Sequence, residues 1–278
     1  MRERGLQFDR VAEAYDRHRP AYPDELVDAA SRAAGLRPGD PVLEVGCGTG
    51  KLTAALVHRG LDVVALDPGP SMIEYARHAI PPGEAEFVEA RFEDAELPSE
   101  GFAAVFSAAA FHWIDPEVSW AKAAAMLRPR GSLVLMGYCG ASEKLTRAHE
   151  AELLRGIERV VPEIAATFPK PRDFETIVNG ARARRADVSE VWSWIGPHDV
   201  RTPAAAGLFG EAEVLTTRVC REQTAAEINS LLGTTSLAFR LGPERMAALA
   251  AENERVVDAA GGRIPLVTLF VAVVAQRA

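Results

Sequence analysis

The sequence predicts an α/β fold, a doubly wound sheet of mostly parallel strands, and two observations lead to this prediction. Residues 41–141 repeat one pattern, in which a short apolar run is followed by a turn and a helix-compatible stretch. This pattern is typical of stacked βαβ units. The apolar runs are nearly continuous, as expected for parallel strands that helices cover on both faces. The expected strands are 41–46, 62–67, 85–90, 102–108 and 132–138.

The later part of the chain has a different organisation. Residues 141–208 are charged, helix-like and rich in proline, and they contain no clear strand pattern. Strand-like sequence returns at 212–223 and 265–277, with two helical stretches between them. We therefore expect a core over 1–140, an inserted helical cap over 141–208 and completion of the core sheet over 209–278.

The composition excludes several classes of function. The 278 residues are 48% hydrophobic, enough for a sizeable core, and carry a formal net charge of −8, which opposes the basic surface that nucleic-acid binding needs. No window approaches the roughly 20 apolar residues of a membrane span, and the N-terminus lacks the apolar region of a signal peptide. The three cysteines have no CxxC spacing, so no zinc site is expected. We expect a cytoplasmic protein that acts on a small molecule, without a metal, a membrane or a nucleic acid.

A glycine-rich loop follows the first expected strand. The stretch LEVGCGTGKL (43–52) places Gly46, Gly48 and Gly50 between a strand and a helix, at the edge where doubly wound sheets bind ligands. Bare backbone lets a ligand approach closely, and free amides at the start of the helix favour negative charge. The second strand ends in Asp67, about 20 residues on, where a carboxylate can accept hydrogen bonds from ribose hydroxyls. Together these features predict a nucleoside site.

Other interpretations of the same loop stay open at this point. The glycines alone can make a tight turn between strand and helix, and Asp67 can serve as the N-cap of the helix that follows. A dinucleotide is disfavoured because the third glycine comes one residue early and Lys51 follows it. ATP is disfavoured because the loop has no GK[ST] sequence.

The residues then match a known family. LEVGCGTGKLT, the acidic Asp67 and LRPRGSLVL resemble the class I S-adenosylmethionine (SAM) dependent methyltransferases. FDRVAEAYDRHRPAYP (8–23) and FHWID (111–115) resemble the small-molecule group of ubiquinone-biosynthesis and trans-aconitate methyltransferase type. The resemblance covers roughly residues 5–140. It implies a Rossmann-like methyltransferase fold, with a seven-stranded sheet whose last strand is antiparallel, and SAM as cofactor with S-adenosylhomocysteine as product.

The resemblance also implies a set of cofactor-binding residues. Asp67 is expected to hold the ribose hydroxyls. In this family an acidic residue often accepts from the adenine amine, but the position here is Arg91, which cannot accept a hydrogen bond, so backbone amides of Arg91 and Phe92 are expected to face the adenine. Pro68 and Met72 are expected to flank it. The residues that the resemblance places near the methionine and ribose are Glu44, Gly46, Cys47, Gly48, Gly50 and Ala108.

The N-terminal segment is predicted to be a lid. Phe8, Val11 and Tyr15 share one helix face, and Arg19 and Tyr22 follow. Tyr15 and Arg19 are expected at the cofactor, where the guanidinium can pair with the SAM carboxylate, and Tyr22 on the acceptor side. The alternative is a solvated arginine on an amphipathic helix.

The acceptor side is predicted from aromatic residues and one histidine. His112 follows the fourth strand at the position that faces the methyl group in the family, beside Trp113, and is the candidate general base; it can equally hydrogen-bond a loop. Trp192 and Trp194 can line an acceptor pocket in the cap or pack its core. The methyl acceptor and the oligomeric state are not predicted.

A non-catalytic SAM-binding module and a nicotinamide-dependent oxidoreductase are the two alternative functions.

Overall fold

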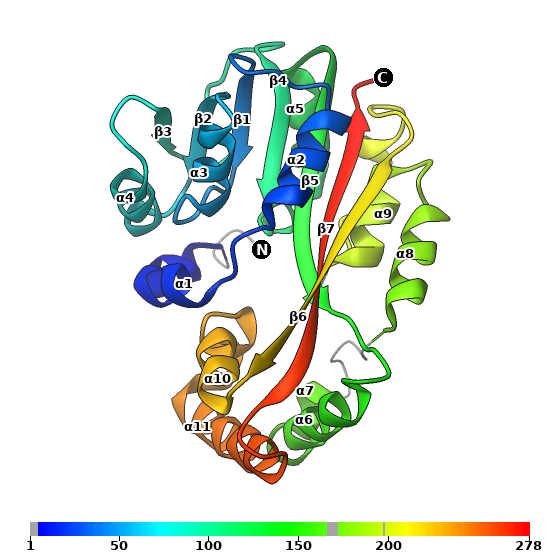
Figure 1. Ribbon diagram of the computed structural model, residues 1–278. Coiled ribbons are helices and arrows are strands. Elements are labelled where there is room, and N and C mark those ends of the chain that lie inside the picture. Colours follow the sequence, from blue (N-terminus) through cyan, green and yellow to red (C-terminus); the bar gives the residue numbers. More distant parts are fainter. Residues whose placement is uncertain (1–4, 166–171, 197) are drawn as a thin grey trace.

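The expected strands form one seven-stranded sheet in the computed structural model, which describes residues 5–165, 172–196 and 198–278. The strand order is β3-β2-β1-β4-β5-β7-β6 (Figure 1). The first five strands pair in parallel, whereas β7 is antiparallel to β5 and to β6. The antiparallel last strand is as predicted. The bounds are β1 Pro41–Val45, β2 Asp62–Asp67, β3 Ala85–Glu89, β4 Phe102–Ala108, β5 Leu127–Gly140, β6 Glu213–Gln223 and β7 Ile264–Gln276.

The fifth strand is longer than the sequence pattern indicated. It begins at Leu127 instead of residue 132, directly after helix α5 (Pro116–Met126). Leu127 pairs with Phe102, and the register with β4 then shifts before Ala104 pairs with Ser132. The Pro129 ring is unsuited to a helix interior, and Arg130 takes a positive φ of 67°, so this segment is extended rather than the end of a helix.

Helices cover both faces of the sheet and also form a separate group (Figure 1). The short 3-10 helices are η1 Gly5–Val11, η2 Phe111–Trp113 and η3 Pro203–Ala205. The other helices in the described ranges are α1 Ala12–His18, α2 Asp24–Ala33, α3 Lys51–His58, α4 Pro70–Ala79, α5 Pro116–Met126, α6 Arg147–Val160, α7 Pro162–Ala165, α8 Phe174–Arg182, α9 Val188–Ile195, α10 Ala225–Gly233 and α11 Ser236–Ala259.

Two apolar layers hold the sheet. On one face, α2 and α3 pack their buried residues against alternate side chains of β1, β2, β4, β5 and β7. On the other face, Trp120 of α5 and Trp192 of α9 pack with Leu133 and Leu135 of β5. Burying apolar surface on both faces is what fixes a parallel sheet, and it explains the near-continuous apolar strands of the sequence.

The helices of 141–208 divide between two places. Helices α8 and α9 lie beside β6 and β7 on the sheet, whereas α6 and α7 join α10 and α11 (Figure 1). The apolar contacts of Ile157, Ile164 and Leu249 hold α6, α7 and α11 together. We call α6, α7, α10 and α11 the distal helix group. Residues 166–171 and 197 of the predicted cap lie outside the described residues, and a single acceptor-side cap over 141–208 stays a prediction.

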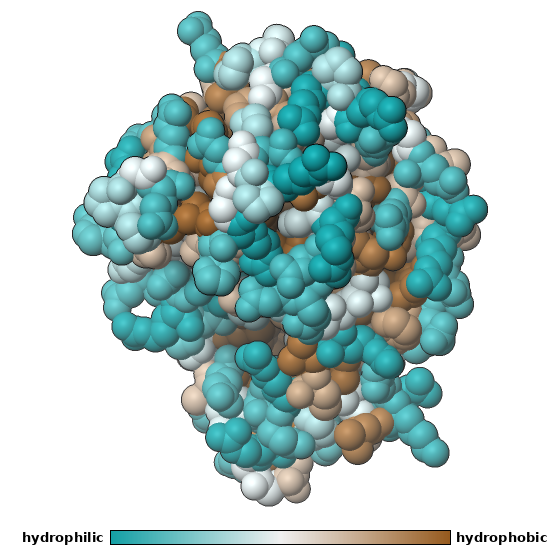
Figure 2. All heavy atoms as spheres, turned by 45° about the horizontal axis from the view of Figure 1, so that its top comes forward, coloured by the Kyte–Doolittle hydropathy of each residue, from teal (hydrophilic) through white to brown (hydrophobic). Residues whose placement is uncertain are grey.

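The strands β6 and β7 extend beyond the parallel strands, and the distal helix group lies at their far ends (Figure 1). Figure 2 shows the resulting constriction between a larger part of the molecule and a smaller one, on a face that is mostly hydrophilic. Helix α1 contacts α10 across this constriction. In the described ranges, no helix combines the length and the apolar character needed to span a bilayer.

Candidate functional site

The glycine loop serves two different purposes. Gly46 has a φ of 74°, and a Cβ there would collide with the Cβ of Ala110. Gly50 has a φ of 84°, and a Cβ would lie 3.0 Å from the Cβ of Ala76. Both positions need glycine for the turn itself. Gly48 also has a positive φ, of 56°, but a Cβ added there would have Tyr15 Cε1, at 3.9 Å, as its nearest neighbour, so this position is open enough for a ligand to approach.

Asp67 ends β2 and is bonded to this loop. Its Oδ2 accepts from the backbone N–H of Gly48 at 2.9 Å, and its Oδ1 accepts from the N–H of Gly69 at 2.8 Å. Burial raises the pKa of the carboxyl to about 6, against the lowering effect of these two bonds. Asp67 does not cap helix α4, because Gly69 is the N-cap residue and the first amides of the helix donate to a different carboxylate.

The carboxylate that reaches those amides belongs to Asp9. Its Oδ1 accepts from the backbone N–H of Ser71 at 2.8 Å and of Met72 at 3.1 Å, and its Oδ2 lies 3.1 Å from the Ser71 hydroxyl. An acidic group at a helix N-terminus is favoured by the helix dipole. Asp9 thereby fastens the N-terminal segment to the helix that follows Asp67. Sequence reasoning missed this residue because its partners are 62 and 63 positions away.

Glu44 presents an unused acceptor to the cleft. The side chain is 1% exposed, and its Oε2 accepts from the Thr53 hydroxyl at 2.6 Å. Its Oε1 has no hydrogen-bond partner within the described residues. Burial raises the pKa of the carboxyl to about 8. A buried acceptor without a donor is costly, so this atom fits a ligand that carries a donor or a positive charge.

Several of these groups line one cleft at the carboxyl edge of the sheet, whereas Asp67 and Gly50 are not among its lining residues, and Asp67 is joined to the cleft through its bond to Gly48. The predicted residues that line it are Tyr15, Arg19, Tyr22, Glu44, Gly46, Cys47, Gly48 and Ala108, and the structure adds Pro20, Thr49, Lys51, Leu52, Ala109 and Tyr138. The free volume in the cleft is about 40 Å³, whereas ligand pockets commonly measure roughly 300–1,000 Å³. In this conformation the cleft is therefore too small for a nucleoside ligand.

Arg19 projects from the end of α1 into the cleft. Its Nε and Nη2 donate to the hydroxyl and the carbonyl of Thr234, at 3.0 and 2.6 Å, and its Nη1 donates to the Tyr138 hydroxyl at 2.6 Å. The guanidinium also lies 5.1 Å from the centre of the Tyr15 ring. Burial raises the pKa of Tyr15 to about 12, so this phenol is neutral. Arg19 is therefore not a solvated arginine, and its partners carry no charge.

The residues expected near the adenine lie beside the cleft and not in its lining. The Met72 side chain is 3% exposed, and that of Phe92 is 2% exposed in the main core. The Arg91 guanidinium pairs with Glu93 at 2.9 Å. The backbone N–H of Ala90 bonds the Asp67 carbonyl at 3.2 Å. This bond holds the segment after β3 beside the end of β2. Pro68 directly follows Asp67 in the same region.

His112 belongs to an aromatic cluster at the end of β4. Its ring lies 4.9 Å from that of Trp113 and 5.2 Å from that of His198, and Trp113 lies 5.6 Å from Phe8 of the N-terminal segment. The side chain is 7% exposed. Burial, with smaller effects of His198 and Arg19, lowers the pKa of His112 to about 3. The ring is therefore a neutral and weak base at ordinary pH.

The tryptophans of α9 are packing residues. Trp192 is 2% exposed, and its ring meets Gly137 of β5, where an added Cβ would be 3.0 Å away. Trp194 donates to the Ile177 carbonyl at 2.9 Å, and the Arg184 guanidinium lies 4.2 Å from its ring. Neither residue lines the cleft. Helix α9 covers a face of the sheet, so this pair lies outside the cleft, and a role for Trp192 and Trp194 in lining an acceptor pocket stays a prediction.

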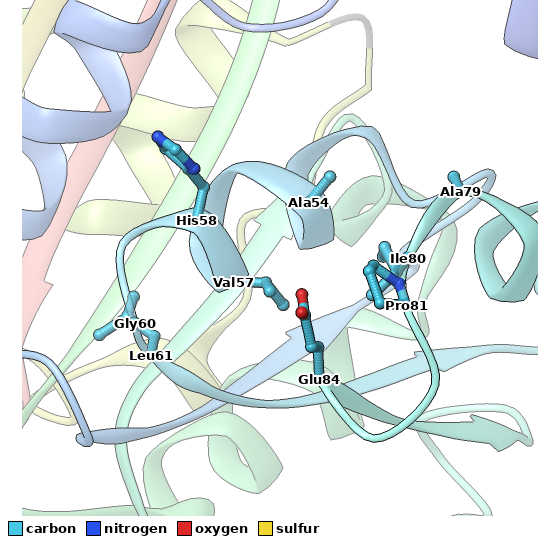
Figure 3. A pocket seen from close by; sticks show the side chains of 9 residues that line it. All are labelled: Ala54, Val57, His58, Gly60, Leu61, Ala79, Ile80, Pro81 and Glu84. Atoms are coloured by element: carbon cyan, nitrogen blue, oxygen red, sulfur yellow. The ribbon is translucent and has the colours of Figure 1, made fainter.

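A groove larger than this cleft lies beside the C-terminal ends of α3 and α4 (Figure 3). It is an open groove of about 560 Å³ between the ends of α3 and α4, lined by Ala54, Val57, His58, Gly60, Leu61, Ala79, Ile80, Pro81 and Glu84. Those helix ends lie at the amino edge of the parallel strands. Doubly wound sheets bind ligands at the carboxyl edge, so the smaller cleft is the candidate site.

Comparison with known proteins agrees with this geometry. Residues 43–135 match the family described as methyltransferase domain. An uncharacterised methyltransferase of Mycobacterium tuberculosis is 44% identical over 135 residues, 49% of this chain and 53% of the relative. A malonyl-[acyl-carrier protein] O-methyltransferase of Anoxybacillus flavithermus is 31% identical over 135 residues, 48% of each chain. The chain thus spans about half the length of these curated relatives.

Solved structures support the fold over nearly the whole chain. A protein from Anaeromyxobacter dehalogenans, provisionally described as a type II methyltransferase, is 21% identical, with a TM-score of 0.59 over 93% of this chain and 97% of its own. A [4+2]-cyclase, 13% identical with a TM-score of 0.52 over 98% and 95%, has the same fold, so the fold alone does not fix the reaction. The sequence match is more specific than the fold: residues 43–135, about a third of the chain, match a methyltransferase domain. Together with the methyltransferase relatives, this match supports a class I SAM-dependent methyltransferase with SAM as cofactor.

Proposed function

We propose that the protein transfers the methyl group of SAM to an oxygen, nitrogen or carbon nucleophile of a small-molecule acceptor. One observation carries the proposal. The cleft contains the unpartnered Oε1 of Glu44 and the guanidinium of Arg19, whose partners in the described chain are all neutral. The Glu44 carboxyl, with its pKa raised to about 8, holds its proton below that pH, and a cation bound at Oε1 would favour its ionised form. Glu44 and Arg19 thus suit the ammonium and the carboxylate of the amino-acid part of SAM.

The other predicted cofactor residues can be assigned to SAM bound with its amino-acid part at Glu44 and Arg19. Gly48 lets the ligand approach the backbone, and Asp67 accepts from the ribose hydroxyls. The Ala108 carbonyl and Cys47 flank the amino-acid side. Bound SAM supplies an electrophilic methyl group. The protein orients it toward the acceptor and excludes water, which accounts for much of the rate of such displacements. The residues that we assign to the adenine side are Pro68, Met72, Arg91 and Phe92.

The acceptor is proposed to be a nucleophile that needs no base, such as a carboxylate. His112, with its pKa lowered to about 3, is a weak proton acceptor, and general bases work best with a pKa near the operating pH. We therefore assign His112 a hydrogen bond to the acceptor instead of proton removal. Trp113 lies beside His112, and Tyr22 is proposed to face the acceptor from the lining of the cleft. The relatives named malonyl-[acyl-carrier protein] O-methyltransferases are consistent with an acid as acceptor.

The proposal is tested by turnover. Purified protein is incubated with SAM carrying a labelled methyl group and a metabolite extract, and formation of S-adenosylhomocysteine and of labelled product is followed. Label that alkali releases as methanol identifies a methyl ester and supports the carboxylate acceptor, whereas label in an alkali-stable product contradicts it. Tight binding of S-adenosylhomocysteine without transfer to any acceptor would favour a non-catalytic SAM-binding module. The cytoplasmic location expected from the sequence is part of this proposal.

A further inference from the structure

Arg19 is held on two sides by residues that the sequence motifs do not include. Thr234 lies 215 positions away, at the end of α10, and offers both its hydroxyl and its carbonyl to one edge of the guanidinium. Tyr138 of β5 accepts from Nη1. A guanidinium has five N–H donors in a fixed planar arrangement. Three of them are used here, so two remain for a ligand.

The Thr234 acceptor is itself fixed. The residue is fully buried, and its hydroxyl donates to the Leu231 carbonyl at 2.7 Å while its backbone N–H bonds the same carbonyl at 3.1 Å. The hydroxyl hydrogen is therefore directed into the last turn of α10, and the oxygen is left to accept from Arg19. Because this acceptor is fixed, the Arg19 side chain is already ordered before a ligand binds. Less side-chain conformational entropy is then lost on binding.

No carboxylate lies within ion-pair distance of Arg19 in the described part of the chain, where its side-chain partners are Thr234, Tyr138 and the rings of Tyr15 and Tyr138. A partly buried cation surrounded by neutral acceptors retains its attraction for an anion. The cleft into which it projects is the proposed SAM cleft.

We propose that Thr234 and Tyr138 are positioning residues that hold Arg19 in the orientation that binds the carboxylate of the cofactor. This rests on the proposed function. It makes the distal helix group part of the cofactor site, because Thr234 is the residue that directly follows α10 and caps its C-terminus. Helix α1 contacts α10 directly, so closure of the N-terminal segment over the cofactor is linked to the position of that group.

The test compares two ligands that differ only in the amino-acid part. S-adenosylhomocysteine carries the carboxylate, and 5′-methylthioadenosine keeps the nucleoside and the thioether without it. Thr234→Val removes the hydroxyl acceptor at similar volume and is expected to raise the dissociation constant of S-adenosylhomocysteine about tenfold, the scale of one hydrogen bond to a charged group. The dissociation constant of methylthioadenosine is expected to stay within about twofold, and Thr234→Ser to restore the wild-type value, because it keeps the bond.

The neighbouring residue Thr235 provides a matched control. The Thr235 hydroxyl bonds the Leu232 carbonyl and not Arg19, so Thr235→Val should leave both affinities unchanged. In an Arg19→Lys background, Thr234→Val should have no further effect, since both changes remove one interaction. If Thr234→Val fails to fold, Tyr138→Phe removes the remaining side-chain bond and must show the same ligand selectivity.

Three outcomes overturn the assignment, and the third also overturns the proposed function. Equal loss of both ligands, or unchanged affinity for S-adenosylhomocysteine in Thr234→Val and Tyr138→Phe, would show that these residues do not act through the carboxylate, while the proposed function would stand. Failure of the wild-type protein to bind S-adenosylhomocysteine at all would overturn the proposed function and this inference with it.

Discussion

The carboxylate of Asp67 accepts a hydrogen bond from the backbone N–H of Gly48, over 2.9 Å. This bond joins the end of β2 to the loop that follows β1, so the two signals that are 19 residues apart in the sequence form one unit in the fold. The second oxygen of Asp67 accepts from Gly69. The carboxylate is thus oriented before any ligand arrives, which lowers the cost of ordering it on binding.

The stability of the protein should depend on pH through Glu44. Burial raises its pKa from 4.5 to about 8, so the folded state binds the proton more tightly than the unfolded state does. The free energy of unfolding should therefore fall as pH rises from about 4.5 to about 8, by several kcal/mol at most. Glu44→Gln, which mimics the protonated form, should match wild type at pH 5 and be the more stable protein at pH 8. Urea unfolding at both values measures this, and parallel pH dependence of the two proteins would refute it.

The N-terminal segment should become protected when cofactor binds. Its Asp9 bonds the first amides of α4, beside Asp67, so Asp9→Ala should speed trypsin cleavage near Arg10 and Arg19 by several-fold, because low-stability segments open most readily. S-adenosylhomocysteine should slow cleavage of the wild type. Glu13→Ala is the control, since Glu13 lies in the same segment and its side-chain partner within the described ranges is the exposed Arg17. Equal cleavage with and without ligand would rule out a lid.

His112 should stay neutral across the working pH range. With its pKa lowered to about 3, its ring signals in a histidine-labelled NMR sample should not shift between pH 5 and pH 8, and comparison with His112→Gln assigns them. Once an acceptor is known, His112→Gln should lower turnover by only about tenfold, the effect of losing orientation, whereas loss of a general base costs roughly 100-fold or more. A signal that titrates near pH 6.5 would restore the general-base role.

Trp192 should matter for stability and not for binding. Its ring is 2% exposed and packs between α9 and β5, so Trp192→Ala should cost about 3–5 kcal/mol of unfolding free energy. The dissociation constant of S-adenosylhomocysteine should not change. Trp113→Ala is the comparison, because Trp113 is only half buried and lies at the proposed acceptor side. A selective loss of ligand affinity in Trp192→Ala would place this residue at the site after all.

The parts of the fold that depend on local pattern could be predicted from the sequence. Strand positions followed from apolar runs that two helix layers cover, and the cleft followed from Gly48 and Asp67 at the strand ends. What escaped prediction depends on distant contacts. The bonds of Asp9 to α4 and of Arg19 to Thr234 join residues 62 and 215 positions apart, and no local spacing encodes them. The α9 tryptophans have the same helical spacing whether they pack a cap or a sheet.

Calorimetric titration with S-adenosylhomocysteine shows whether this cleft is a SAM site. Wild type should bind one equivalent and show no heat with NADH. Asp67→Ala should weaken binding by about 1–3 kcal/mol, the worth of hydrogen bonds to a charged acceptor. Asp62→Ala, at the exposed start of the same strand, should leave it unchanged. Binding of NADH, or unchanged affinity for S-adenosylhomocysteine in folded Asp67→Ala, would show that the cleft beside Asp67 is not a SAM site.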